Sequence, residues 1–267
     1  MVIASVGSSS SGNSYIIATE NSTIILDVGL PAKRIVEALY TIGREPEVVD
    51  AVLITHEHTD HVKSVRAIGR QCSNAVFYAS RGTVDNTAHF QHIDDERIHY
   101  LAAGDEFGPF DEDDIEITAF ALSHDAAEPL GFTIRAEDEK LAVVTDCGII
   151  TDEIFDVIKD ADILIFEANH DEDLLMYGAY PYFLKQRIKS DVGHLSNRAA
   201  GELLADVLRH KEDGILHILL AHLSQNNNVP FRARETIEEI LDEAGFERDI
   251  HYTLEIASAS ELTLFRE

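Results

Sequence analysis

Three histidines and an aspartate fall within one six-residue stretch of the chain. The stretch reads His56-Glu57-His58-Thr59-Asp60-His61 and follows an apolar run that predicts a strand. A loop at the end of a buried strand can direct imidazole and carboxylate groups at one point, as a divalent metal site requires. The alternative is a polar loop that is rich in histidine by chance. Ligand-type residues elsewhere in the chain decide between the two interpretations.

Three further segments carry such residues directly after an apolar run. They are Ser123-His124-Asp125, Thr145-Asp146 and Ala221-His222. Because each segment ends a predicted strand, we expect their side chains at one edge of the sheets, together with those of residues 56–61. A chance histidine-rich loop does not explain this matching supply of ligands. The sequence therefore predicts a metal centre.

The elements that position these residues form two β-rich halves. The predicted strands cover residues 2–6, 14–18, 24–28, 51–55, 75–79, 115–122, 131–136, 141–145, 163–166, 215–221, 252–256 and 262–265, the last two forming a pair. The predicted helices cover residues 31–42, 61–71, 82–90, 152–159, 197–210 and 230–244. Two β-rich halves with helices outside predict an α/β fold of four layers, αββα, in a single domain of residues 1–267. The acidic segments 94–96 and 111–114 are predicted to be solvated loops.

The His-rich motif resembles the second motif of the metallo-β-lactamase superfamily, which has the form H-x-H-x-D-H. Further blocks make the sequence similar to the YycJ/WalJ branch of that superfamily. They are SSSGNS at 9–14, SHDAAEP at 123–129, EANHD at 167–171, YP at 180–181, GHLSN at 193–197 and HLSQNN at 222–227. The resemblance implies a bacterial, cytosolic, metal-dependent nuclease of the 5′-to-3′ DNA exonuclease type.

The resemblance also implies two divalent metal ions per chain. Carried over residue by residue, His56, His58 and His124 would hold one ion, Asp60, His61 and His222 the other, and Asp146 would bridge both. Asp27 would orient a metal ligand without contacting the ion itself, and the alternative is that this residue only shapes the turn after its strand. Histidine and carboxylate donors suit zinc or manganese, and also iron. Cys147, beside Asp146, is expected to face the core instead.

Two ions about 3.5–4 Å apart can share a hydroxide and make it nucleophilic near neutral pH, which suits phosphodiester cleavage. Asp60 is predicted to take part in this catalysis. Histidine at position 58 resembles the hydrolases, whereas the diiron flavoprotein relatives carry glutamate there. The departing alkoxide needs a proton. His170, oriented by Glu167 or Asp171, is the predicted donor, and His194 is the second candidate.

Contacts with the substrate are predicted at six residues, which are Ser11, Asn13, Lys185, Arg187, Ser196 and Asn197. Lys185, Arg187 and Lys189 alternate as on one face of an extended segment, and the neighbouring Tyr180, Tyr182 and Phe183 can stack on bases. The alternatives are a packed aromatic cluster with a solvated basic edge and, for Ser196 or Asn197, a helix cap.

Composition narrows the function classes. The chain has 21 Lys and Arg against 49 Asp and Glu, a net charge of −28, which argues against general affinity for nucleic acid. At the site itself, two divalent ions and the basic residues around His194 would supply positive charge that attracts phosphate. The chain has no apolar run of about 18 residues and no signal peptide, and its cysteine content is low, so we expect a cytoplasmic protein without a membrane partner.

The predicted substrate is nucleic acid, as single-stranded DNA or DNA ends, and the oligomeric state is open. Two other functions are considered. One is a hydrolase of small esters or thioesters that uses the same metals, which the net charge favours. The other is a metal-holding regulatory module without catalysis, against which the complete ligand set argues.

A net charge of −28 is also typical of proteins that work at high salt, where carboxylates aid solubility and salt screens their repulsion. If this explains the charge, the melting temperature should rise as potassium chloride increases from low to molar concentration. A scanning fluorimetry series checks this. A melting temperature that is flat or falls over that range would remove the explanation.

Overall fold

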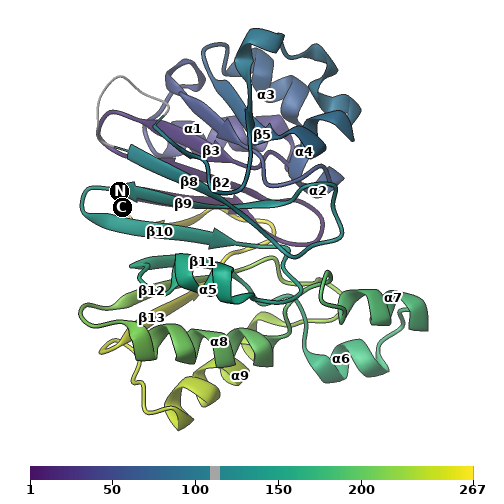
Figure 1. Ribbon diagram of the computed structural model, residues 1–267, viewed down its shortest axis with the longest axis vertical. Helices are drawn as coiled ribbons and strands as arrows, with labels where there is room; N and C mark the ends of the chain where they lie inside the picture. The colour runs from purple at the N-terminus through teal and green to yellow at the C-terminus, as the bar shows by residue number, and fades with distance from the viewer. Residues whose placement is uncertain (109–114, 267) are drawn as a thin grey trace. The chain divides into compact units, whose positions relative to one another are not determined.

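The computed structural model describes residues 1–108 and 115–266, so the predicted acidic loop at 111–114 lies outside the described residues. The chain forms two compact units (Figure 1). Unit 1 comprises Met1–Ala121, Ala126–Asp138 and Ser258–Glu267, and unit 2 comprises Leu122–Asp125 and Glu139–Ala257. None of the described helices is long and apolar enough to cross a bilayer.

Unit 1 is built on a seven-stranded mixed sheet. Its strands run in the order β14, β1, β2, β3, β4, β5, β6, antiparallel from β14 to β3 and parallel from β3 to β6. Their bounds are β1 (Val2–Gly7), β2 (Ser14–Ala18), β3 (Thr23–Leu26), β4 (Ala51–Leu53), β5 (Val76–Ser80), β6 (Ile98–Leu101) and β14 (Thr263–Arg266). The parallel strands β3 and β4 are buried along their whole length, as expected for strands covered on both faces, whereas β6 at the edge exposes His99 and Tyr100.

Helices α1 (Ala32–Thr41) and α3 (Val65–Gln71) contribute Leu39 and Ile68 to a buried apolar cluster that also contains Val52 of β4. The other described elements of unit 1 are η1 (Pro46–Val48), α2 (Thr59–Val62), α4 (Arg81–Asp85), η2 (Ala88–His92), η3 (Asp95–Arg97) and the antiparallel strands β7 (Glu106–Phe107), β8 (Ile115–Ala121) and β9 (Leu130–Ala136). Residues 94–96 are exposed, as predicted.

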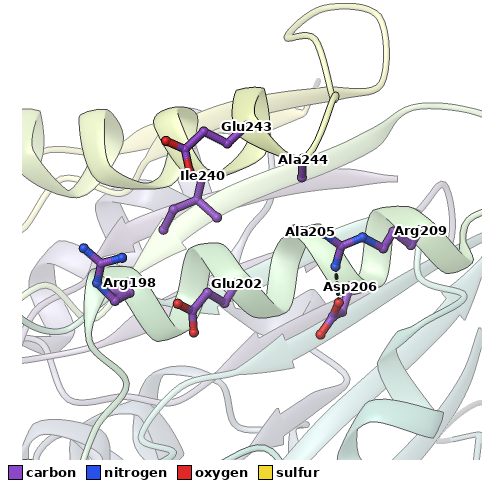
Figure 2. Close-up of a pocket in the computed structure, with 8 residues that line it drawn as sticks. All are labelled: Arg198, Glu202, Ala205, Asp206, Arg209, Ile240, Glu243 and Ala244. Carbon is purple, nitrogen blue, oxygen red and sulfur yellow. Dashed lines mark hydrogen bonds and ion pairs between the residues drawn. The ribbon is translucent and has the colours of Figure 1, made fainter.

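Unit 2 has a parallel sheet of β10 (Glu139–Val144), β11 (Ile163–Glu167), β12 (Leu216–Ala221) and β13 (Tyr252–Ile256). Its helices are α5 (Asp152–Ile158), α6 (Glu172–Tyr177), α7 (Tyr182–Ile188), α8 (Asn197–His210) and α9 (Pro230–Glu243). Helices α8 and α9 lie side by side (Figure 1), and an open groove of about 370 Å³ lies between them (Figure 2). The groove is lined by Arg198, Glu202, Ala205, Asp206, Arg209, Ile240, Glu243 and Ala244, and so contains none of the predicted metal ligands.

Four sequence predictions are wrong in detail. The helix predicted at residues 82–90 is divided into α4 and the 3-10 helix η2. Residues 61–71 form two helices, because the backbone N–H and hydroxyl of Ser64 donate to the carbonyls of Val28 and Leu30. The last two strands do not pair: β13 adds in parallel to β12 in unit 2, whereas β14 adds antiparallel to β1 in unit 1. Residues 182–188 form helix α7 instead of an extended segment, because Pro181 precedes a run of good helix formers.

Strand ends in both units use unusual backbone at the predicted site. Asp27 after β3, Asp146 after β10 and His222 after β12 have positive φ values of 57°, 59° and 54°, in the left-handed region. At Gly29, an added Cβ would lie 1.5 Å from the carbonyl oxygen of Asp60, so this position requires glycine. The chain therefore turns sharply wherever it leaves a strand to present these residues.

Candidate metal centre

Unit 1 brings together the four predicted ligands of residues 56–61. The ring centroids of His56 and His58 lie 4.6 Å apart, and those of His56 and His61 lie 4.1 Å apart. Asp60 Oδ2 lies 3.6 Å from His61 Nε2. The cause is local: α2 begins directly after His58, so Asp60 and His61 lie on its first turn beside the histidines that precede it.

Asp27 holds His61 in place. It is fully buried, and its Oδ2 accepts a hydrogen bond of 2.7 Å from His61 Nδ1. Its Oδ1 accepts the backbone N–H of Thr55 at 2.9 Å, and the Thr55 hydroxyl lies within 3.1 Å of both carboxylate oxygens. A carboxylate on Nδ1 fixes the tautomer of the ring and directs Nε2 outward as a donor. Asp27 thus both makes the turn and orients His61.

Unit 2 brings together Asp146, Glu167, His194 and His222, whose donor atoms lie within 4.8 Å of one another. Parallel strands cause this grouping, because Asp146 follows β10, Glu167 ends β11 and His222 follows β12, all at the carboxyl edge of the sheet. Asp146 Oδ1 lies 3.4 Å from His222 Nε2 and 3.8 Å from the Nε2 of His124.

Glu167 is the centre of this group. Its Oε1 accepts hydrogen bonds from His194 Nδ1 and His222 Nδ1, each at 2.8 Å. Its Oε2 accepts the backbone N–H groups of Cys147 at 2.9 Å and Leu195 at 3.2 Å. The side chain is fully buried, so these four donors replace the water that a carboxylate would otherwise need.

Charges in unit 2 reinforce this arrangement. Burial alone would raise the pKa of Glu167. The charge of His194 and the hydrogen bonds from His194 and His222 outweigh this effect and lower the pKa to about 2. Burial lowers the pKa of His194, but the charge and hydrogen bond of Glu167 outweigh it and raise the pKa above its usual value. At His124 burial prevails and the pKa is lowered. Glu167 is therefore ionised near neutral pH, and His194 holds a proton more readily than a free histidine.

His170 lies in a different environment from the one expected. It is 2% exposed, and its Nδ1 has no hydrogen-bond partner within residues 1–108 and 115–266. Burial lowers its pKa to about 4. The expectation that Glu167 or Asp171 orients His170 and keeps it charged is wrong, because Glu167 is engaged as described and Asp171 caps α6 and pairs with Arg232.

Two of the predicted substrate contacts lie in the turn before β2. Ser11 is exposed there. Asn13 is fully buried, with its Oδ1 accepting from Ser8 Oγ and its Nδ2 donating to the carbonyl of Ser9. The same Nδ2 lies 3.2 Å from His61 Nε2. Asn13 therefore shapes the turn beside His61, and the prediction that it contacts the substrate is not supported by its burial.

The two basic candidates on α7 are engaged within unit 2. Lys185 Nζ donates to the backbone carbonyls of Met176 and Gly178, and Arg187 pairs with Asp125. Cationic side chains are thus present as predicted, but Arg187 is neutralised by a carboxylate.

At the start of α8 the structure supports the helix-cap alternative. Ser196 is the N-cap, and its Oγ accepts the N–H of Ala199. The side-chain amides of Asn197 and Asn228 are paired in the interior at 2.8 and 3.0 Å. Both side chains thus hold this helix, and contact with the substrate at Ser196 and Asn197 stays a prediction. Cys147 is buried as expected, and its Sγ donates to the carbonyl of Ile149.

Sequence reasoning missed the roles of Glu167, Thr55 and Asn169. Asn169 Nδ2 donates to the carbonyl of His222 at 3.0 Å and so supports that left-handed residue. Glu167 had one available signal, because a carboxylate that continues an apolar strand is buried only if it is paired. Thr55 and Asn169 are recognisable only from the fold.

The donor chemistry of both units suits a divalent cation, since imidazole and carboxylate groups are grouped there and buried carboxylates orient the rings. A family model described as a beta-lactamase superfamily domain matches residues 26–218. The chain belongs to this family. Divalent metal binding follows from the family and the donor clusters together.

Individual relatives agree with this assignment. Exodeoxyribonuclease YycJ of Bacillus anthracis is 38% identical over 248 residues, which cover 90% of this chain and 89% of that protein. Exodeoxyribonuclease WalJ of Streptococcus pneumoniae is 36% identical over 244 residues, covering 90% and 87%. The crystal structure of the metallo-beta-lactamase fold protein YhfI from Bacillus subtilis matches with a TM-score of 0.71 at 15% identity, covering 98% of this chain and 99% of that one. The predicted fold class is confirmed.

The carboxylates behind the histidines generate a testable prediction. Asp27→Asn and Glu167→Gln should each weaken metal binding by about 10–100-fold, because an amide no longer fixes the tautomer and charge of the ring it contacts. Competition with a chromogenic chelator measures the affinity.

The matched control is Asp162→Asn. Asp162 is a partly buried carboxylate of the same chain that accepts from Lys140 N and Lys211 Nζ. This variant should bind metal like the unchanged protein. Equal metal affinities in all three variants would contradict the orienting roles of Asp27 and Glu167.

Proposed function

We propose that the protein is a metal-dependent 5′-to-3′ exonuclease that acts on single-stranded DNA or DNA ends in the cytoplasm. One joint observation carries the proposal. The chain has clusters of metal donors at strand ends, and it is 36–38% identical over 90% of its length to two proteins named exodeoxyribonucleases.

In this proposal His56, His58 and His124 would hold one zinc or manganese ion, Asp60, His61 and His222 would hold a second, and Asp146 would serve as a ligand of both. Iron would suit the same donors. The position of Asp146 Oδ1 near both His124 and His222 supports the bridging role. When bound, the two ions would supply a nucleophile at neutral pH and neutralise charge on the phosphate.

The side chains of the protein would then orient ligands and move a proton. Asp27 holds His61 and Glu167 holds His222, each through the Nδ1 atom of the ring. His194 also donates its Nδ1–H to Glu167, and its partly exposed ring can donate the Nε2 proton to the departing alkoxide. We infer that His194 is the proton donor in preference to His170, whose ring is 2% exposed. Ser11, exposed in the turn before β2, stays a candidate for contact with the substrate.

The central experiment is an exonuclease assay on single-stranded DNA with the label at the 5′ or the 3′ end, using zinc- or manganese-loaded protein. We expect the 5′ label to be released first and the 3′-labelled strand to shorten stepwise. A chelator should abolish both, and 5′-phosphate and 5′-hydroxyl strands compared side by side define the end that is recognised.

Asp146→Ala is the matched inactive variant. It should lose the activity and hold fewer than two ions per chain by elemental analysis. Loaded protein that hydrolyses a small ester or thioester but no DNA would instead favour the small-molecule hydrolase. Loaded protein that hydrolyses none of these substrates would favour a regulatory module.

A second prediction concerns the proton. His194→Ala should slow DNA hydrolysis by about 10²–10⁴-fold, the usual contribution of a positioned acid. The loss should be much smaller with bis-p-nitrophenyl phosphate, whose leaving group needs little protonation. Steady-state rates on both substrates, with the metal content measured in parallel, check this.

His170→Ala is the comparison variant, because the sequence pointed to that residue. We expect it to show no selectivity between the two substrates. If His170→Ala shows the selective loss and His194→Ala does not, the proton comes from His170 and our assignment is wrong.

A further inference from the structure

A pair of short helices in unit 2 exposes aromatic side chains. We call residues 172–189, which contain α6, α7 and the turn between them, the α6–α7 lobe; both helices are seen together in Figure 1. Tyr177, Tyr182 and Phe183 are 84%, 75% and 73% exposed. Large aromatic side chains dominate the energetics of cores and interfaces. Three rings this exposed on 18 residues therefore indicate a surface that contacts another molecule.

The charge of this segment is opposite to that of the rest of the chain. Residues 172–189 contain Lys185, Arg187 and Lys189 against Glu172 and Asp173, a net charge of +1 in a chain whose net charge is −28. Both acidic residues lie at the start of the lobe, and residues 174–190 contain no aspartate or glutamate. With 49 acidic residues among 267, a stretch of 17 would contain about three. Within the described residues, neither Lys185 nor Lys189 has a carboxylate within 4.0 Å. The lobe is therefore suited to a polyanion, which the remaining acidic chain repels.

Two of the rings, those of Tyr177 and Tyr182, lie beside Lys185. Lys185 Nζ donates to the carbonyls of Met176 and Gly178, the residues on either side of Tyr177, at 2.9 and 2.8 Å. Tyr182 lies one helical turn before Lys185 on α7, so both project from the same face of that helix. Lys185 thus connects the end of α6, where Tyr177 lies, to the face of α7 that carries Tyr182.

The lobe is tied to three unit 2 segments, those that carry His124, His194 and His222. Asn226 Nδ2, in the loop after His222, donates to the hydroxyl of Tyr180 at 2.8 Å. Arg187 pairs with Asp125, the neighbour of His124. The N–H of His194 donates to the carbonyl of Ile188, the last residue of α7, at 2.9 Å.

We propose that the α6–α7 lobe is a stacking platform for the bases of a single-stranded nucleic acid. Exposed aromatic rings supply sequence-independent stacking, and neighbouring lysines attract the phosphates. The ties to the loops of His124, His194 and His222 keep the platform in register with the ligands of unit 2. The proposal rests on the proposed nuclease function and names the part of the chain that holds the substrate beyond the reacting phosphate.

The test measures binding separately from cleavage. Metal-loaded protein is titrated into a fluorescent, phosphorothioate-protected single strand, and the dissociation constant is read from anisotropy. Tyr177→Ala, Tyr182→Ala and Phe183→Ala should each weaken binding by roughly 5- to 150-fold, the range for losing one base–aromatic stack. Because all three side chains are exposed, the variants should keep the melting temperature and metal content of the unchanged protein.

Two controls separate stacking from other effects. Tyr40→Ala removes an aromatic ring of 58% exposure on α1 and should leave the affinity unchanged. The triple variant combines Tyr177→Ala, Tyr182→Ala and Phe183→Ala. A strand with a run of abasic sites should bind the unchanged protein as weakly as the normal strand binds this triple variant. The triple variant should not distinguish the two strands.

Unchanged affinity in the triple variant would overturn the proposal. So would a triple variant that still distinguishes abasic from normal strands. If the lobe instead joins two copies of the chain, light scattering should show a dimer for the unchanged protein and a monomer for the triple variant. The DNA affinity of the two proteins would then be the same. A third outcome is that single strands bind through the lobe but unprotected strands are not degraded. This result would contradict the nuclease function and would still support the stacking platform.

Discussion

The arrangement of unit 2 depends on one buried carboxylate. Glu167 accepts four hydrogen bonds, from the rings of His194 and His222 and from the backbone of Cys147 and Leu195. Hydrogen bonds to a charged group contribute about 1.5–3 kcal/mol each, and a buried carboxylate without them would be strongly destabilising. The loops after β10, β11 and β12 and the segment before α8 therefore meet at one point because this charge must be satisfied.

Unit 1 uses the same solution on a smaller scale. Asp27 is buried and accepts a hydrogen bond from the Nδ1–H of His61. The backbone N–H and the hydroxyl of Thr55 also donate to its carboxylate. In both units a carboxylate from a strand end sets the tautomer of a histidine, and the histidine presents its other nitrogen. Binding of a cation then needs little rearrangement of side chains, which reduces its entropic cost.

The sequence predicts most of the fold and the contiguous half of the candidate site. The donors from His56 to His61 are visible because one loop carries them all, and strong apolar runs identify nearly every strand. The role of Glu167 was not predictable in the same way, since its partners lie 20, 27, 28 and 55 residues away. The pairing of β13 and β14 was wrong because nearness in sequence does not reveal which sheet an edge strand joins.

Helix α7 shows a further limit of pattern reading. Alternating cations suggested an extended segment, but helix propensity after Pro181 prevails in so short a stretch. The exposure of Tyr182 and Phe183 also excludes the packed aromatic cluster, which the amino-acid types alone left open.

The left-handed backbone at Asp27, Asp146 and His222 has a consequence for the evolution and engineering of this chain. Strained positions of this kind cost on the order of 1–3 kcal/mol each, and glycine would relieve much of that cost. Glycine at position 27 or 222 would also remove buried hydrogen bonds to a charged group, worth about 1.5–3 kcal/mol each, from Thr55 and His61 to Asp27 and from His222 to Glu167. The relief of backbone strain therefore does not favour glycine at these two positions. Stability and metal binding select the same side chains at Asp27 and His222, so engineering of this chain can leave both positions unchanged at no loss of stability.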